Sequence, residues 1–188
     1  MFTGEFKGIK IIVKRGDLTE EKADAVVNPA NSMGVMTGGV ALALKEKGGE
    51  VIEKDAIRSA PIRIGRAVLT TGGKLASRRV IHAPTLEKPS DVTTSLVVNK
   101  ATWAALKLAH DNSFRAIAFP ALGTGIGGVG LNDAAKAMEI AVKKYAEECN
   151  FKPVVKEVRF IAFTKEMESA WDEVFERLVN AKVESLQE

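Results

Sequence analysis

Apolar residues in this chain form short runs, which alternate with longer stretches where apolar positions recur every three or four residues. The short runs predict strands at Ile9–Val13, Ala25–Val27, Ala67–Thr71, Val80–His82, Arg115–Phe119 and Val154–Phe163. The longer stretches predict helices at Gly38–Lys47, from Gly49 to about Arg58, around Val97–Leu108, from Asn132 to about Tyr145 and around Met167–Leu178. Ser90 or Asp91 is the expected N-cap of the third helix.

This order of elements predicts the fold class. Strands that alternate with helices favour an α/β architecture, with helices on both sides of a mostly parallel sheet. The first two strands have no obvious helix between them, so we expect the sheet to be mixed. No linker-like segment interrupts the 188 residues. We therefore predict one domain spanning residues 1–188, with its core at about 8–180.

Composition excludes several classes of protein. No stretch approaches the roughly 18 consecutive apolar residues of a membrane span, and the first residues do not resemble a secretory signal. Cys149 is the single cysteine, and no Cys/His cluster suggests zinc. We expect a cytoplasmic protein without a metal or a cofactor. The net charge is +3, and basic residues are interleaved with acidic ones, which favours a solvated surface over a nucleic-acid-binding stripe.

The segment Arg115–Gly130 holds the most informative motif. An apolar strand enters a loop with glycines at 123, 125, 127, 128 and 130, just before a helix. Glycines allow backbone N–H groups to turn toward an anion, so the loop suits a diphosphate; a tight structural turn is the alternative. The loop also matches G-x-G-x-x-G, but the acid that a dinucleotide fold needs is absent from the next strand end, because Glu148 lies in or after a helix. No Lys-Ser/Thr pair follows the glycines, which excludes a Walker A loop.

Two further segments combine polar side chains with a preceding strand. In Arg15–Thr19, Asp17 can accept a hydrogen bond from an exocyclic amine or can cap a short helix. In Asn28–Asn31, the two amides can bind hydroxyl groups or can mark a turn. His82, within an apolar strand, is expected to be a hydrogen-bonded core residue.

In order and spacing, these segments resemble the macro domain family. The family motifs correspond here to Gly16-Asp-Leu-Thr, Val27-Asn-Pro-Ala-Asn, Gly38-Gly-Val and Ala118-Phe-Pro-Ala-Leu-Gly-Thr-Gly-Ile-Gly-Gly. The resemblance covers roughly residues 8–180. It implies a three-layer α/β/α sandwich around a mixed, mostly parallel sheet of about six strands, with a cleft over the carboxyl edge of the sheet.

The resemblance also implies a role for individual residues. Asp17 would accept from the adenine amino group, with Leu18 beside it, and Phe163 would stack on the adenine. Asn31 would bind the distal ribose and is the best candidate for a catalytic residue. The diphosphate would lie between two stretches of backbone, which comprise Gly38, Gly39 and Val40 on one side and Gly123, Thr124, Gly125, Ile126 and Gly127 on the other.

Two positions depart from the family pattern. Hydrolytic relatives of one large branch carry an Asp after Gly-Gly-Val, where this chain has Ala41, which cannot accept a proton. Many relatives have an aromatic residue where this chain has Gly127, which predicts a more open distal end. Three hypotheses follow. The first is a hydrolase, which acts on O-acetyl-ADP-ribose, on ADP-ribose-1″-phosphate, or on ADP-ribosylated protein or nucleic acid. The second is a non-catalytic reader of ADP-ribosylated macromolecules, and the third, less favoured, is a nucleic-acid or poly(A) binder.

Overall fold

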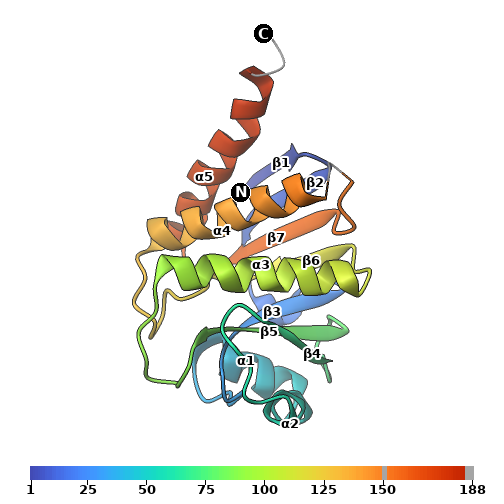
Figure 1. The fold of residues 1–188 in the computed structure, drawn as a ribbon, viewed down its shortest axis with the longest axis vertical. Helices are drawn as coiled ribbons and strands as arrows, with labels where there is room; N and C mark the ends of the chain where they lie inside the picture. Colours follow the sequence, from blue (N-terminus) through green and yellow to red (C-terminus); the bar gives the residue numbers. More distant parts are fainter. Residues whose placement is uncertain (150–151, 185–188) are drawn as a thin grey trace.

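The computed structural model of the chain describes residues 1–149 and 152–184 (Figure 1). Its strands are β1 (Phe2–Phe6), β2 (Ile9–Arg15), β3 (Ala25–Asn31), β4 (Val68–Thr71), β5 (Arg79–Leu86), β6 (Ala116–Phe119) and β7 (Glu157–Ala162). Its α-helices are α1 (Gly39–Gly48), α2 (Val51–Arg58), α3 (Ser95–Asp111), α4 (Leu131–Glu148) and α5 (Lys165–Glu184), and a short 3₁₀ helix, η1, covers Leu18–Glu20. None of the described helices is long and apolar enough to cross a membrane.

The strands form one sheet in the order β1-β2-β7-β6-β3-β5-β4. The five central strands run parallel, whereas β1 and β4 pair antiparallel with β2 and β5 at the two edges. The predicted mixed, mostly parallel sheet is therefore confirmed. Seven described strands replace the expected six, because β1 was not predicted: it forms a hairpin with β2 through Lys7 and Gly8, which both have positive φ.

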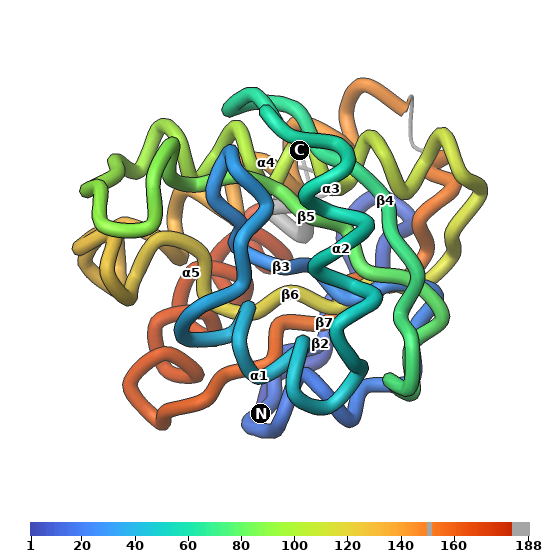
Figure 2. The backbone as a smooth tube through the Cα atoms, turned by 90° about the horizontal axis from the view of Figure 1, so that it is seen from below, coloured from blue at the N-terminus to red at the C-terminus, as the bar shows by residue number. Residues whose placement is uncertain are grey.

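Helices cover both faces of the sheet, as the α/β/α prediction required. Alternate residues of each strand point to opposite faces, and the two faces bury two separate cores. Ala25 and Val27 of β3 belong to the larger core under α3, α4 and α5, whereas Val26 belongs to a smaller core with Leu44 of α1 and Ile52 of α2. Helices α1 and α2 lie at the lower end of Figure 1, and Figure 2 views the molecule from that end.

The third helix begins later than the sequence predicted. The Thr94 hydroxyl, rather than Ser90 or Asp91, caps α3 by accepting from the Val97 N–H at 3.4 Å. Asp91 instead accepts from the Lys88 N–H at 2.8 Å and closes a turn within the preceding loop.

The strand lengths also differ from those predicted. β3 and β5 extend to Asn31 and Leu86, beyond the predicted apolar runs, and β7 ends at Ala162, one residue before Phe163. The extensions include Asn28 and other polar residues that an apolar pattern does not reveal.

Candidate functional site

The carboxyl ends of the parallel strands bring the predicted site residues to one edge of the sheet. Asp17 follows β2, Phe163 follows β7, and the glycine-rich loop Gly123–Gly130 follows β6. Asn31 is the last residue of β3. Because β3 pairs with β6, this end of β3 is on the same side of the sheet edge as that loop. Residues far apart in sequence therefore share one edge because their strands are neighbours in the sheet.

The connections after β3 and β6 diverge to opposite faces of the sheet. The chain leaves β3 through residues 32–38 to α1, whose buried residues belong to the smaller core. It leaves the adjacent β6 through the glycine-rich loop to α4, whose buried residues belong to the larger core. Such a point, where neighbouring connections turn opposite ways, is where open α/β sheets bind ligands.

Both connections present backbone N–H groups that have no acceptor within the described residues. In the glycine-rich loop, the Gly123, Gly125 and Gly127 carbonyl oxygens accept from the N–H groups of Val129, Gly128 and Thr93. The N–H groups of Gly123 through Gly127 donate to no atom of residues 1–149 or 152–184. The carbonyl dipoles are thus engaged by protein while the N–H dipoles remain available, which is the arrangement of an anion-binding nest.

The start of α1 supplies a second set of such groups. Its N-cap is Gly38, which has no side chain to cap the helix, and its first turn contains no acidic residue. The N–H groups of Gly39, Val40 and Ala41 belong to the first turn, where no carbonyl precedes them in the helix. Together with the helix dipole, they favour an anion at this position.

The glycines at this edge fall into two kinds. A Cβ built on Gly38, Gly39 or Gly125 would meet no atom within 4 Å, so open space adjoins the backbone there. A Cβ on Gly127 would lie 2.7 Å from the Thr93 methyl group, so this glycine serves packing within the protein. Thr93 fills the space next to Gly127, and a more open distal end stays a prediction.

Asp17 and Phe163 lie beside each other at the ends of β2 and β7, where the Gly16 N–H donates to the Ala162 carbonyl at 3.0 Å. Asp17 caps η1: its Oδ1 accepts from the Thr19 hydroxyl at 2.7 Å and the Thr19 N–H at 2.8 Å. These two bonds lower the pKa of the Asp17 carboxyl, which is ionised at neutral pH. Phe163 is 91% exposed, which is unusual for an aromatic side chain and leaves its ring faces free.

Asn31 organises the loop that leads to α1. Its Oδ1 accepts from the N–H groups of Met33 and Val35 at 3.1 and 3.3 Å, and its Nδ2 donates to the Val35 carbonyl at 2.8 Å. Most of the bonding capacity of its amide is therefore used within the protein. The side chain is nearly buried, and it fixes the shape of the loop beside the α1 N-terminus.

Glu53 on α2 also holds this loop, and sequence reasoning did not find it. Its Oε1 accepts from the Met36 N–H at 2.6 Å, and its Oε2 pairs with Lys45 at 3.0 Å. Burial works against the charged form, but the Met36 N–H and Lys45 outweigh it and lower the pKa of the Glu53 carboxyl. Gly34 adds a third restraint, because a Cβ there would lie 2.8 Å from the backbone of Ala56.

Asn28, the other amide of this segment, does not reach the edge. It is buried within β3, and its Nδ2 contacts Nδ1 of His82 at 3.1 Å. Nε2 of His82 contacts the Thr70 hydroxyl at 2.9 Å, so the imidazole is bonded at both nitrogens, as expected of a core histidine. Burial lowers the pKa of His82 to about 4, and the ring is neutral at pH 7.

Leu18 and Ala41 differ from the exposed site residues. Both are buried in the smaller core, which Val40 also contacts. Leu18 therefore contributes packing beneath the site instead of an open face. Ala41 places a methyl group at the position where hydrolytic relatives carry an Asp.

A separate hollow of about 310 Å³ lies away from this edge. It is lined by the side chains or backbone of Ile64, Gly65, Asn99, Lys100, Trp103 and Lys144. The Lys144 ammonium group lies 5.2 Å from the centre of the Trp103 ring. None of the predicted site residues contributes to this hollow.

Two proteins are similar to this chain in sequence over most of its length. An uncharacterized protein of Aquifex aeolicus is 46% identical over 164 residues, which cover 87% of this chain and 96% of that protein. An uncharacterized protein of Aeropyrum pernix is 47% identical over 131 residues, covering 70% of this chain and 69% of that protein.

Solved structures share the fold. The Oceanobacillus iheyensis macrodomain with ADP superimposes with a TM-score of 0.82 at 22% identity, covering 96% of this chain and 97% of that one. The Trypanosoma brucei macrodomain in complex with ADP-ribose gives a TM-score of 0.78 at 25% identity, covering 88% of this chain and 68% of that one. The family model of the macro domain matches residues 27–138, which include most of β3, all of α1 and the glycine-rich loop, and the start of α4. The chain belongs to the macro domain family.

Proposed function

We propose that this protein binds ADP-ribose at the carboxyl edge of its sheet. The observation that carries the proposal is the pair of unengaged N–H sets, one at Gly39–Ala41 and one at Gly123–Gly127, on connections that diverge around the switch point. A diphosphate has oxygen acceptors and negative charge in the arrangement that such N–H groups bind. Open space beside Gly38, Gly39 and Gly125 permits its close approach.

The side chains beside these loops indicate where the adenine and the distal ribose of ADP-ribose would bind. Phe163 offers an exposed ring for stacking on adenine, and the ionised Asp17 offers a carboxylate oxygen for the adenine amino group. Asn31, beside the α1 N-terminus, then lies toward the distal ribose. The bound ADP and ADP-ribose in the Oceanobacillus iheyensis and Trypanosoma brucei macrodomains support this class of ligand.

The buried methyl group of Ala41 favours a reader over a hydrolase. General-base catalysis requires a group that accepts a proton within hydrogen-bond reach of the attacking water. Ala41 cannot do this, and its side chain packs in the smaller core. We therefore assign binding as the function, with ADP-ribosylated macromolecules as the partners.

Calorimetric titration with ADP-ribose, AMP and NAD tests the ligand class. We expect tight binding of ADP-ribose and much weaker binding both of AMP, which lacks the diphosphate, and of NAD. Equal affinity for AMP would show that the two N–H sets do not bind a diphosphate. No binding of ADP-ribose would refute the proposed function.

Turnover assays separate a reader from a hydrolase. The substrates are O-acetyl-ADP-ribose, ADP-ribose-1″-phosphate, and ADP-ribosylated protein and nucleic acid. We expect no release of product above the uncatalysed rate, while each substrate competes with ADP-ribose for binding. Product formation by the wild-type protein would show that another group activates the water.

A further inference from the structure

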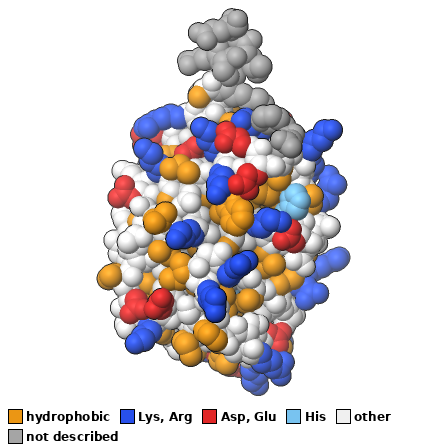
Figure 3. Space-filling model, viewed as in Figure 1, with side chains coloured by type: hydrophobic (Ala, Val, Ile, Leu, Met, Phe, Trp, Pro, Cys, Tyr) orange, Lys and Arg blue, Asp and Glu red, His pale blue; other side chains and the backbone are white. Residues whose placement is uncertain are grey.

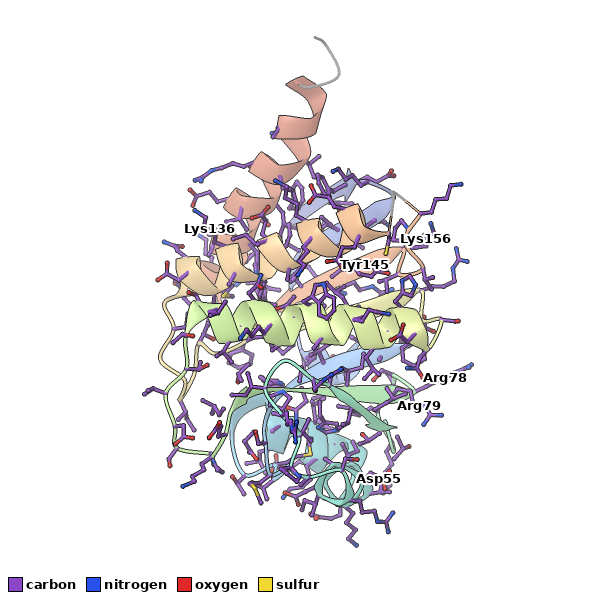
Figure 4. All side chains as sticks on the ribbon, viewed as in Figure 1. Asp55, Arg78, Arg79, Lys136, Tyr145 and Lys156 are labelled. Carbon is purple, nitrogen blue, oxygen red and sulfur yellow. The ribbon has the colours of Figure 1, made fainter. Side chains whose placement is uncertain are left out.

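The edge of the sheet opposite the proposed ADP-ribose site carries a row of basic side chains. Arg78 and Arg79 stand at the start of β5, Arg115 precedes β6, and Lys156 precedes β7. All four are exposed. Figure 4 shows Arg78, Arg79 and Lys156 on one side of the molecule, and in the same view Figure 3 shows basic side chains gathered along that margin. We call these four residues the basic edge.

Strand register places the four residues close together although they are distant in sequence. Arg79 is opposite Ala25 of β3, which in turn is opposite Ile117 of β6. The Lys156 N–H donates to the Arg115 carbonyl at 2.8 Å, so these two residues are direct neighbours. Strands lie about 4.8 Å apart, so the row from β5 to β7 spans roughly 14 Å.

The basic edge keeps an excess of positive charge. None of its four side chains forms an ion pair with any residue in the ranges 1–149 and 152–184. Asp24 is at the same edge and contributes one formal negative charge, while its Oδ2 accepts from the N–H groups of Arg115 and Ala116 at 2.8 and 2.9 Å.

The carboxylates at the nearby helix ends are paired with lysines outside the row. Asp111 pairs with Lys107 at the end of α3, and Glu148 pairs with Lys144 at the end of α4. Together with Asp24, the four cations leave a formal charge of +3 within about 14 Å at this edge.

The composition of the edge favours phosphate over a lipid surface. Three of the four cations are arginines, whose planar guanidinium groups bind phosphate oxygens in pairs. Surfaces that attach to membranes usually combine basic residues with apolar side chains that insert between lipids. Among the described residues, none of the exposed large hydrophobic side chains lies in the segments that precede β3, β5, β6 or β7.

We propose that the basic edge binds the phosphate backbone of nucleic acid, independently of the ADP-ribose site on the opposite edge. A row of about 14 Å is long enough for several consecutive phosphates of one strand. Binding would rest on charge and not on base sequence, because phosphate contacts position a nucleic acid without identifying its bases. The protein would thereby hold nucleic acid and ADP-ribose at opposite ends of the same strands.

The test is a fluorescence-anisotropy titration of a labelled 20-base-pair DNA duplex between 50 and 200 mM salt. Four phosphate contacts predict a slope of log K against log salt of about −3.6, which is a loss of affinity of roughly 100-fold across this range. The variant Arg78→Ala/Arg79→Ala/Arg115→Ala/Lys156→Ala should lose both the affinity and the slope. It should retain wild-type affinity for ADP-ribose, which also shows that it is folded.

The matched control removes four exposed lysines from other parts of the surface. Lys54, Lys88, Lys136 and Lys165 are exposed, and none forms an ion pair within the described part of the chain. Their fourfold change to Ala has the same effect on net charge and should leave the slope nearly unchanged.

Three outcomes would overturn the proposal. The first is that the wild-type protein does not bind the duplex at 50 mM salt. The second is that the control variant loses as much affinity for the duplex as the basic-edge variant does. The third is that the basic edge binds phosphatidylserine vesicles but not the duplex. None of these outcomes bears on ADP-ribose binding, which is measured separately.

Discussion

The two kinds of glycine at the carboxyl edge predict that binding and stability can be lost separately. Gly125→Val places a side chain in open space, since no atom lies within 4 Å of the added Cβ, and its φ is not positive. Gly123→Ala places a Cβ 2.6 Å from the Val98 side chain, at a φ of +73°. The first change should block the approach of the diphosphate, and the second should strain the folded protein.

The magnitudes follow from these contacts. For Gly123→Ala, the left-handed backbone costs about 1–2 kcal/mol, and the overlap with Val98 costs about 1–3 kcal/mol. A loss near 3 kcal/mol in a protein of this size lowers Tm by roughly 6–12 °C. Gly125→Val should change stability by about 0.5 kcal/mol or less, as is usual for an exposed surface position. Its effect on binding should be large, because a β-branched side chain occupies the space beside the N–H groups.

The assay pairs thermal unfolding with calorimetric titration of ADP-ribose for each variant. Gly65→Ala is a control, because Gly65 has a φ of +84° but open space beside it, away from the site. It should lose only the backbone contribution of about 1–2 kcal/mol and bind ADP-ribose normally. Wild-type affinity in Gly125→Val would refute the assignment of this backbone to the diphosphate. An unchanged Tm in Gly123→Ala would refute the packing argument.

Three further predictions concern single side chains. Asp17→Ala and Asn31→Ala should each weaken ADP-ribose binding by about 1–3 kcal/mol in calorimetric titrations, because a polar partner is lost; unchanged affinity in both would mean that the site lies elsewhere. Phe163→Ala should weaken binding of ADP-ribose by about 1–3 kcal/mol through lost stacking, with no change in Tm, since the ring is 91% exposed. Because burial lowers the pKa of His82 from 6.5 to about 4, its contribution to stability is complete above pH 6.5 and is lost as the pH falls through 4. Urea unfolding should show a decline of about 3 kcal/mol over this range, which His82→Gln should remove; equal pH dependence in both proteins would contradict this.

The sequence predicted the central strands and helices well, because each follows an apolar period. It did not predict β1, since Phe2, Gly4 and Phe6 give a short and weak alternation. The turn after it, Lys7-Gly8, also lacks the Asn-Gly or Asp-Gly signal of a tight hairpin. The strand gains its stability from pairing with β2, which is information that no local window contains.

Sequence patterns also did not predict where individual polar side chains lie in the fold. Asn28 and Asn31 are three residues apart in one motif, yet one is bonded to His82 in the core and the other holds a loop. The basic edge was hidden for a related reason. Arg78, Arg115 and Lys156 are far apart along the chain, and only the order of the parallel strands collects them.

The two faces of the sheet bury cores of different size, and this difference has a consequence for motion. One wall of the proposed site, at the start of α1, rests on the smaller core, whereas the glycine-rich loop leads into α4 on the larger one. Regions with fewer buried apolar contacts open more often, so α1 and α2 should exchange their amide hydrogens faster than α4. A ligand that bridges both walls would join the two halves mechanically. Binding of this ligand would therefore slow amide exchange in α1 and α2 far more than in α4.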